Sequence, residues 1–254
     1  MTGQSALLTG PDAARLVQAA ARITSIPELR LAIIGGVAVA CRVGTLFRAT
    51  TDVDAVSAEL AYSTDSVASS ADLLVVRDIA TRVPRGAATD LSVDGTTVQI
   101  IDTEPIPPDV RDIEPALSRL FVQAHRFALD SAEPMPVVVH DPEVEARIPV
   151  AITVALIATK LHALADRHDD AKKASDAHDL MRLLGLVRSS GGPDRLAEAP
   201  GLAETIADVM DDVLVENAER AVRYMHVYGD HGLPQFDAEE VRLRASSFVR
   251  MIRS

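Results

Sequence analysis

The chain has 254 residues, 48% of them hydrophobic, and a formal net charge of −12. This length and apolar content predict a globular protein with a substantial core, built as one large domain or two small ones. The acidic balance argues against a simple nucleic-acid clamp, because binding a phosphate backbone draws on basic patches. The sequence has neither a secretion signal nor an apolar run long enough to span a bilayer, and its single cysteine, Cys41, cannot form an internal disulfide. We therefore expect a cytoplasmic protein without a membrane partner.

The first part of the chain alternates short apolar runs with turns. Residues 1–10 are expected to form a frayed leader, and the helical spacing of apolar residues over Pro11 to Ile23 predicts an amphipathic helix. Short apolar or alternating runs predict strands at Asp72 to Arg77, Ala88 to Val93, Thr97 to Ile101 and Val137 to His140. This mixture is typical of an α/β protein.

One apolar run ends in two glycines. Leu31 to Ile34 is predicted to be a buried strand, because Gly35 and Gly36 close it with a turn signal. Glycine has no Cβ, so the backbone can approach a ligand closely and adopt positive φ. A helix beginning at about Val37 would direct its free N–H groups at an anion held there. The pattern therefore indicates a phosphate site, although a structural turn has the same signature.

Two aspartates separated by one residue follow this run. If Asp52 and Asp54 lie on a strand, its period of two puts both carboxylates on one face and points Val53 into the core. Two carboxylates this close repel each other unless a cation or a proton lies between them. Oxygen ligands of this kind suit Mg²⁺. A charged surface loop is the alternative.

From Pro149 onward the chain carries long helical patterns and almost no strand signal. The helix expected over Val150 to Asp166 is apolar around most of its circumference, so it should be largely buried. Lys160 interrupts it, and a buried lysine is costly unless its ammonium reaches a partner or a cavity. Lys160 can therefore face the phosphates of a ligand, or it can be a lysine that extends to solvent at a domain boundary.

A second helix is expected shortly after Lys160. Asp176 and Asp179 are three residues apart and so share one face of it. They can belong to a functional site, or they can simply cap the helix or pair with Lys172 and Arg182.

The order and spacing of these motifs resemble the DNA polymerase β-like nucleotidyltransferase superfamily, whose signature is a hydrophobic strand, Gly-Gly, a short helix and Asp-x-Asp. Gly35, Gly36, Asp52 and Asp54 match it directly. More narrowly, the run from Arg48 to Asp54 resembles the AbiEii/AbiGii (MenT-like) toxin family. The pairing of Lys160-Leu161 with Asp176-x-x-Asp179-Leu180 resembles the second half of that family's signature. The gap between the lysine and the first aspartate is longer than usual in the family, which leaves open whether Asp176 or Asp179 carries the role.

The resemblance implies an α/β (α+β) fold, with a polymerase β-like nucleotidyltransferase core on a mixed sheet and a C-terminal helical domain. The implied domains are residues 1–145, the nucleotidyltransferase domain, and residues 146–254, a helical domain that closes the nucleotide cleft. It also implies a third carboxylate on a strand beside Asp-x-Asp, and Asp102 is the position that resembles it, unless this residue only ends a strand. The implied metal ligands are Asp52, Asp54 and Asp102. The implied catalytic residues are the same three aspartates together with Lys160 and Asp176. The implied nucleotide-binding residues are Gly35, Gly36, Arg48, Thr51, Lys160 and Asp179.

The implied activity is a Mg²⁺-dependent transfer of a nucleoside monophosphate from an NTP to an acceptor, most simply the 3′ end of tRNA, with release of diphosphate. Such a protein would be the toxin of a type IV, AbiE-like toxin–antitoxin system, restrained by a separately encoded antitoxin. Two alternatives stay open: a small-molecule nucleotidyltransferase of the aminoglycoside-modifying type, which the acidic balance favours, and a catalytically idle relative that acts as a binding partner. For an RNA acceptor, the nearest basic groups in sequence are Arg42, Arg48, Arg167, Lys172 and Lys173.

Overall fold

The computed structural model describes residues 5–45, 50–58, 69–84, 89–103, 113, 115–189, 193–199, 201–230 and 232–254. The chain divides into two compact units, one formed by Met1–Pro105 with Ala128–Ile152 and the other by Ile106–Phe127 with Thr153–Ser254. In the described residues the first unit holds every strand and the second is helical. The division into separate domains at residues 145 and 146 stays a prediction.

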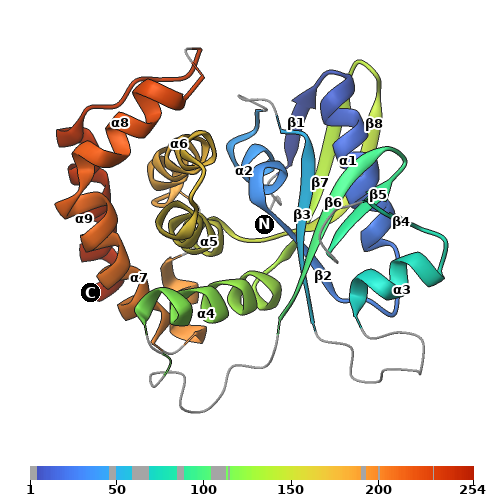
Figure 1. Cartoon of the computed structure of the whole chain (residues 1–254), viewed down its shortest axis with the longest axis horizontal. Coiled ribbons are helices and arrows are strands. Elements are labelled where there is room, and N and C mark those ends of the chain that lie inside the picture. The colour runs from blue at the N-terminus through green and yellow to red at the C-terminus, as the bar shows by residue number, and fades with distance from the viewer. Residues whose placement is uncertain are drawn as a thin grey trace. The chain divides into compact units, whose positions relative to one another are not determined.

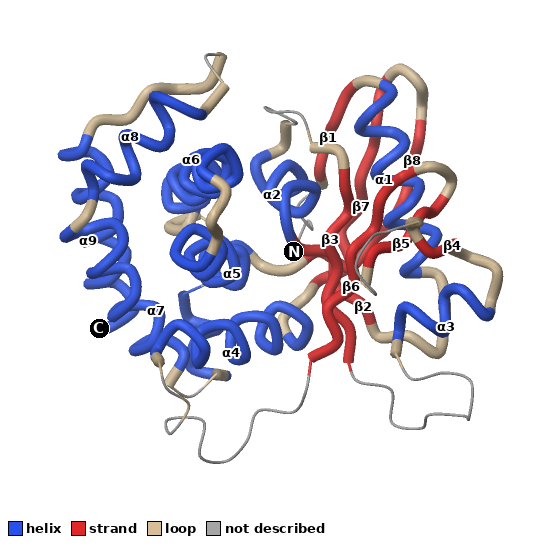
Figure 2. The backbone as a smooth tube through the Cα atoms, in the orientation of Figure 1, coloured by secondary structure: helices blue, strands red, loops and turns tan. Residues whose placement is uncertain are grey.

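The first unit, here called the sheet unit, is built on an eight-stranded mixed sheet (Figures 1 and 2). Its strands are β1 (Ala6–Thr9), β2 (Leu31–Ile34), β3 (Asp52–Ala58), β4 (Thr81–Arg82), β5 (Asp90–Val93), β6 (Thr96–Thr103), β7 (Glu133–His140) and β8 (Val144–Val150). Their order across the sheet is β1-β7-β8-β2-β3-β6-β5-β4. The pairs β1/β7, β2/β8 and β3/β6 are parallel, and the remaining pairs are antiparallel. The prediction of a mixed sheet is confirmed.

Three helices cover this sheet: α1 (Pro11–Thr24), α2 (Gly35–Val43) and α3 (Ser70–Val76). Figure 1 shows α2 on one face of the sheet and α1 and α3 on the other. All four residues of β2 are buried, because the sheet is covered on both faces at its centre. The buried side chains of α1 recur at helical spacing, as predicted for an amphipathic helix.

The second unit, here called the helical unit, contains most of α4 (Ala116–Asp130). Its other elements are α5 (Thr153–Asp166), α6 (Asp170–Leu186), η2 (Pro193–Glu198), α7 (Leu202–Met210), η3 (Asp211–Glu216), α8 (Ala218–Tyr228) and α9 (Ala238–Arg253). The helix α5 is buried on nearly every side, as its apolar sequence predicts. It packs on α6, which also packs on α8 and α9. Asp169 begins α6 by accepting a hydrogen bond from the Lys172 backbone N–H (2.9 Å).

Three local predictions are wrong. Residues 6–9 are not part of a frayed leader, because β1 pairs in parallel with β7 along its whole length. The apolar run after Asp72 is helical, because Ser69 caps the helix by accepting a hydrogen bond from the Asp72 N–H (3.1 Å). The helix expected from Val150 begins only at Thr153, because Val144–Val150 is a strand paired along its length with β7.

None of the helices in the described ranges is both long and apolar enough to cross a membrane.

Candidate functional site

Gly35 and the carboxylate of Asp54 lie against each other in the sheet unit. The antiparallel pairing of β2 and β3 places Ile34 opposite Asp54, so the chain enters α2 directly beside this carboxylate. Gly35 has φ +65, and a Cβ on it would lie 1.9 Å from Asp54 Oδ2. Only glycine therefore fits, for two separate reasons: the left-handed backbone and the lack of space. The helix begins at Gly35, two residues earlier than predicted.

Asp52 and Asp54 lie on one face of β3. Both are half-buried, whereas Val53 between them is 0% exposed, which confirms the predicted alternation. Two carboxylates on one face, next to the start of a helix, fit Mg²⁺, which takes one or two protein carboxylates together with substrate phosphates and water. The described residues contain no group of three or more His, Cys, Asp or Glu side chains that could hold a metal. Further ligands would therefore come from the substrate, from water or from outside this part of the chain.

The structure does not bring Asp102 to this pair, and the expectation that it lies beside Asp52 and Asp54 is corrected. In the parallel pairing of β3 with β6, Asp102 is opposite Ser57, whereas Asp54 is opposite Gln99. Since successive side chains alternate between faces, Asp102 and Asp54 point to opposite sides of the sheet. Asp102 instead accepts a hydrogen bond from the Ser70 N–H (3.1 Å) at the start of α3.

Two other predicted nucleotide-binding residues, Arg48 and Thr51, precede β3 in the sequence. Thr51 is exposed immediately before the strand. Arg48 lies outside the described residues. The neighbouring Thr50, which the sequence analysis did not select, is buried, and its Oγ1 has no hydrogen-bond partner within the described part of the chain.

A second constellation lies in the helical unit, where α5 packs on α6. Lys160 Nζ is 2.7 Å from Asp176 Oδ1 and 2.7 Å from Asp179 Oδ2. Both aspartate side chains are 1% exposed and that of Lys160 is 8% exposed, so the ammonium does not extend to solvent. The structure thus brings together three of the predicted site residues, and both aspartates contact the lysine.

Arg167 completes this cluster. Its Nε lies 3.2 Å from Asp176 Oδ2, and its side chain is partly exposed. Two cations thereby face two carboxylates, which compensates charges that would be costly to bury alone. Sequence reasoning had placed Arg167 only among basic groups for RNA. Arg167 follows Lys160 by seven residues, which is about two helical turns. This spacing could have indicated that the two side chains share one face of the helix.

Two of the basic groups considered for RNA binding are not on an exposed face. Arg42 is 6% exposed, and its guanidinium donates hydrogen bonds to the carbonyl oxygens of Ala151 (2.9 Å) and Val150 (3.0 Å). Arg42 therefore fastens α2 to the end of β8. Lys173 is also buried. The expectation that Arg42 and Lys173 belong to an exposed basic face is therefore wrong.

A sequence model of one protein family, described as "Nucleotidyl transferase AbiEii toxin, Type IV TA system", matches residues 19–242. This match spans both constellations. No curated protein sequence matches the chain.

Proposed function

This chain belongs to the AbiEii family of nucleotidyl transferase toxins of type IV toxin–antitoxin systems, and from that premise we propose that it transfers a nucleoside monophosphate from an NTP to the 3′ end of tRNA. In such a transfer, an acceptor hydroxyl oxygen forms a bond to the α-phosphorus while the bond to the leaving diphosphate breaks. The hydroxyl proton passes to a base or to water. A separately encoded antitoxin would restrain the activity.

The observation that carries this proposal is the contact of Gly35 with the Asp54 carboxylate. It places an acidic pair, Asp52 and Asp54, at a helix start where backbone N–H groups lack intrahelical acceptors. We propose that the two aspartates hold Mg²⁺ and that Gly35 and Gly36 approach the nucleotide phosphates. The metal, when bound, would neutralise the charge that develops as diphosphate leaves.

We assign Lys160 to the nucleotide phosphates as well. A lysine used for electrostatic stabilisation must be held in place before the substrate arrives. Asp176 and Asp179 hold the Lys160 side chain in place, because a carboxylate oxygen of each lies 2.7 Å from the ammonium nitrogen. Asp176 also pairs with Arg167, so it links two cations, and it is the stronger candidate for the role that the sequence left undecided.

A second candidate acceptor is a cationic small molecule of the aminoglycoside type. The net charge of −12 favours it, because an acidic protein attracts cationic substrates. Arg42 is buried and its guanidinium is hydrogen-bonded to backbone carbonyl oxygens, which removes one of the basic groups that an RNA-binding face could have used. The choice between these acceptors therefore belongs to an experiment.

The deciding assay offers both acceptors to the purified protein. Each of the four labelled NTPs is supplied with Mg²⁺, total tRNA and a panel of aminoglycosides in the same experiment. We expect the unaltered protein to label tRNA and Asp54→Asn to label nothing. We also expect expression of the unaltered protein, but not of Asp54→Asn, to arrest growth. Labelled antibiotic with unlabelled tRNA would replace the tRNA proposal with the small-molecule one. Label on neither would favour a protein acceptor or the idle-relative interpretation.

A further inference from the structure

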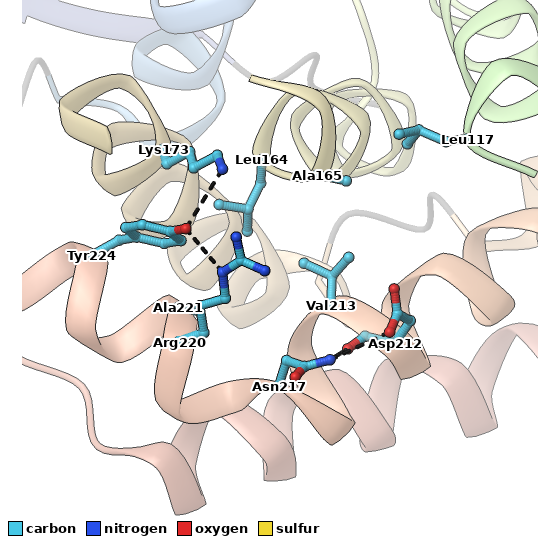
Figure 3. Close-up of a pocket in the computed structure, with 10 residues that line it drawn as sticks. All are labelled: Leu117, Leu164, Ala165, Lys173, Asp212, Val213, Asn217, Arg220, Ala221 and Tyr224. Carbon is cyan, nitrogen blue, oxygen red and sulfur yellow. Dashed lines mark hydrogen bonds between the residues drawn. The ribbon is translucent and has the colours of Figure 1, made fainter. Parts of the chain in front are cut away.

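A cavity of about 200 Å³ lies within the helical unit and is lined by residues of α4, α5, α6, η3 and α8 (Figure 3). Its inner wall includes the buried side chains of Leu164, Lys173 and Tyr224. Its lining also includes the exposed residues Asp212 and Arg220. The cations of the lining gather around Tyr224 at one end of the cavity, and Asp212 lies at the other end (Figure 3).

Two cations converge on one phenol in the lining of the cavity. Arg220 Nε donates a hydrogen bond to the Tyr224 hydroxyl oxygen (2.9 Å), and Lys173 Nζ donates to the same oxygen (3.5 Å). Both also lie over the ring, at 5.7 Å from its centroid for Arg220 Cζ and 5.1 Å for Lys173 Nζ. In Figure 3 the remaining guanidinium nitrogens of Arg220 point away from the phenol, toward the space between Leu164 and Val213.

The buried Lys173 differs from the buried Lys160 in what compensates its charge. Lys160 has two carboxylates at 2.7 Å, whereas Lys173 has no ion pair with any carboxylate within the described ranges, and neither has Arg220. A buried ammonium with only a phenol as its partner retains much of its desolvation cost. An anion in the cavity would supply the missing charge.

The Tyr224 hydroxyl adds a donor to this end of the cavity. Burial alone would raise the pKa of Tyr224, but the hydrogen bonds from Arg220 and Lys173 and their positive charges outweigh it, so the pKa lies below its usual value. Its oxygen already accepts from both cations, so its own proton is available to an incoming acceptor. The Tyr224 hydroxyl proton, the Lys173 ammonium and the outer guanidinium nitrogens of Arg220 are therefore the donors that the lining offers to a group with several anionic oxygens.

The other end of the cavity limits what that group can be attached to. Asn217 Nδ2 donates to Asp212 Oδ1 (3.3 Å), and the Asp212 carboxylate disfavours a second anionic group there. A volume of about 200 Å³ is below the roughly 300–1,000 Å³ of sites that enclose a whole drug-sized ligand. The fitting ligand has its anionic end near Tyr224 and a neutral or hydrogen-bond-donating body toward Asp212.

We propose that this cavity binds the phosphate group of an organic phosphate, held by Lys173, Arg220 and Tyr224. The phosphate can belong to a free nucleotide or to a nucleic-acid strand, since both present the same oxygens. The cavity is one helical turn from the Lys160 cluster, because Leu164 follows Lys160 by four residues on α5 and Lys173 precedes Asp176 by three on α6. The inference does not depend on nucleotide transfer.

Calorimetric titration of the full chain without divalent metal tests this proposal. The probes are inorganic phosphate, a nucleoside 5′-monophosphate, and a short single-stranded RNA without a terminal phosphate. The variants are Lys173→Met and Arg220→Met. Arg223→Met, an exposed arginine on the same helix outside the cavity lining, is the control with the same change of charge. Thermal unfolding of each variant verifies that it is folded.

We expect phosphate-bearing probes to bind at least about tenfold more weakly to Lys173→Met and Arg220→Met, since each removes a charge-assisted hydrogen bond, and unchanged binding to Arg223→Met. Variant-sensitive binding of the monophosphate would identify a free nucleotide as the source, and such binding of the RNA alone would identify a strand. Equal affinities in all folded variants would overturn the proposal. Loss of nucleotide transfer in Asp54→Asn is measured separately, so the two proposals can fail independently.

Discussion

The two aspartate pairs of this protein differ in how their charge is accommodated. Asp52 and Asp54, in the sheet unit, are half-buried on one face of a strand. Asp176 and Asp179, in the helical unit, are buried against Lys160, and Asp176 also pairs with Arg167. The first pair is only half-buried, whereas the second is buried and in contact with the cations that compensate it.

This difference predicts that the two aspartate pairs respond differently when one of their charges is removed. A half-exposed pair can be neutralised without harming the fold, because water solvates what remains. A buried ion network is sensitive to the loss of any member, because the others remain buried without compensation. The predictions below test whether this contrast holds.

The largest effect is expected for Lys160→Met. It leaves two buried carboxylates without the ammonium that both contact, and breaking a buried ion pair costs about 3–5 kcal/mol of unfolding free energy. Asp54→Asn, the matched change in the sheet unit, is expected to alter the unfolding free energy by no more than about 0.5 kcal/mol. Denaturant unfolding of both variants measures this. Equal losses in the two variants would remove the contrast between the pairs.

Acid sensitivity is the next effect, and it arises in the helical unit. His125 is buried beside His162 and Phe121, and burial lowers its pKa from 6.5 to about 4, although the hydrogen bond with the Phe121 carbonyl opposes this. Between these two pH values the unfolded chain binds a proton at His125 that the folded chain does not, so stability falls as the pH falls. The full shift corresponds to about 3 kcal/mol.

His125→Gln tests this origin, because its side chain carries no titrating group and keeps a donor for the Phe121 carbonyl. Urea unfolding at pH 7, 6, 5 and 4 should show a shallower decline for the variant. His162 also has its pKa lowered by burial, so part of the acid sensitivity should remain. An unchanged decline would assign the acid response to other groups, with His162 as the first candidate.

Sequence reasoning succeeded where the relevant geometry is local. The common face of Asp52 and Asp54 follows from the strand period alone, and the burial of α5 follows from its composition. The position of Asp102 could not be predicted in this way, because it depends on the register between β3 and β6, which is set by packing along both strands. The prediction correctly placed Asp102 on the strand next to β3. It could not specify on which side of the sheet the Asp102 side chain lies.

Other features depended on contacts between distant residues. The segment Ala6–Thr9 is a strand only because β7, more than 120 residues later, pairs with it. The apolar residues after Asp72 favour a strand by propensity, but the Ser69 cap and the packing of a helix outweigh that preference. Lys173 was selected only as a surface charge, since nothing near it in sequence indicates Tyr224, 51 residues away.

A smaller effect concerns the glycine beside Asp54. Gly35→Ala and Gly44→Ala both place a side chain at positive φ, +65 and +79, but only Gly35 faces an atom, Asp54 Oδ2, within contact distance. The shared backbone strain costs about 1 kcal/mol in each variant. The clash adds roughly 1–3 kcal/mol at Gly35 alone and displaces the Asp54 carboxylate.

The comparison of these two variants therefore isolates the clash. Thermal unfolding should rank Gly44→Ala above Gly35→Ala, and nucleotide transfer should be lost in Gly35→Ala while Gly44→Ala retains it. Full transfer by Gly35→Ala would show that the contact with Asp54 is not needed for the chemistry.

The smallest effect is the stabilisation of the sheet unit by Mg²⁺ alone. If Asp52 and Asp54 hold the ion, a tenfold excess over its dissociation constant stabilises the fold by about 1.4 kcal/mol, because the ion binds the folded chain and not the unfolded one. The shift in unfolding midpoint should vanish in Asp54→Asn. Asp102→Asn is the matched control, since it neutralises a carboxylate on the adjacent strand that points to the opposite face and can still accept the Ser70 hydrogen bond. A shift lost in Asp102→Asn and kept in Asp54→Asn would reassign the metal to the other side of the sheet, and with it the site where the nucleotide must bind.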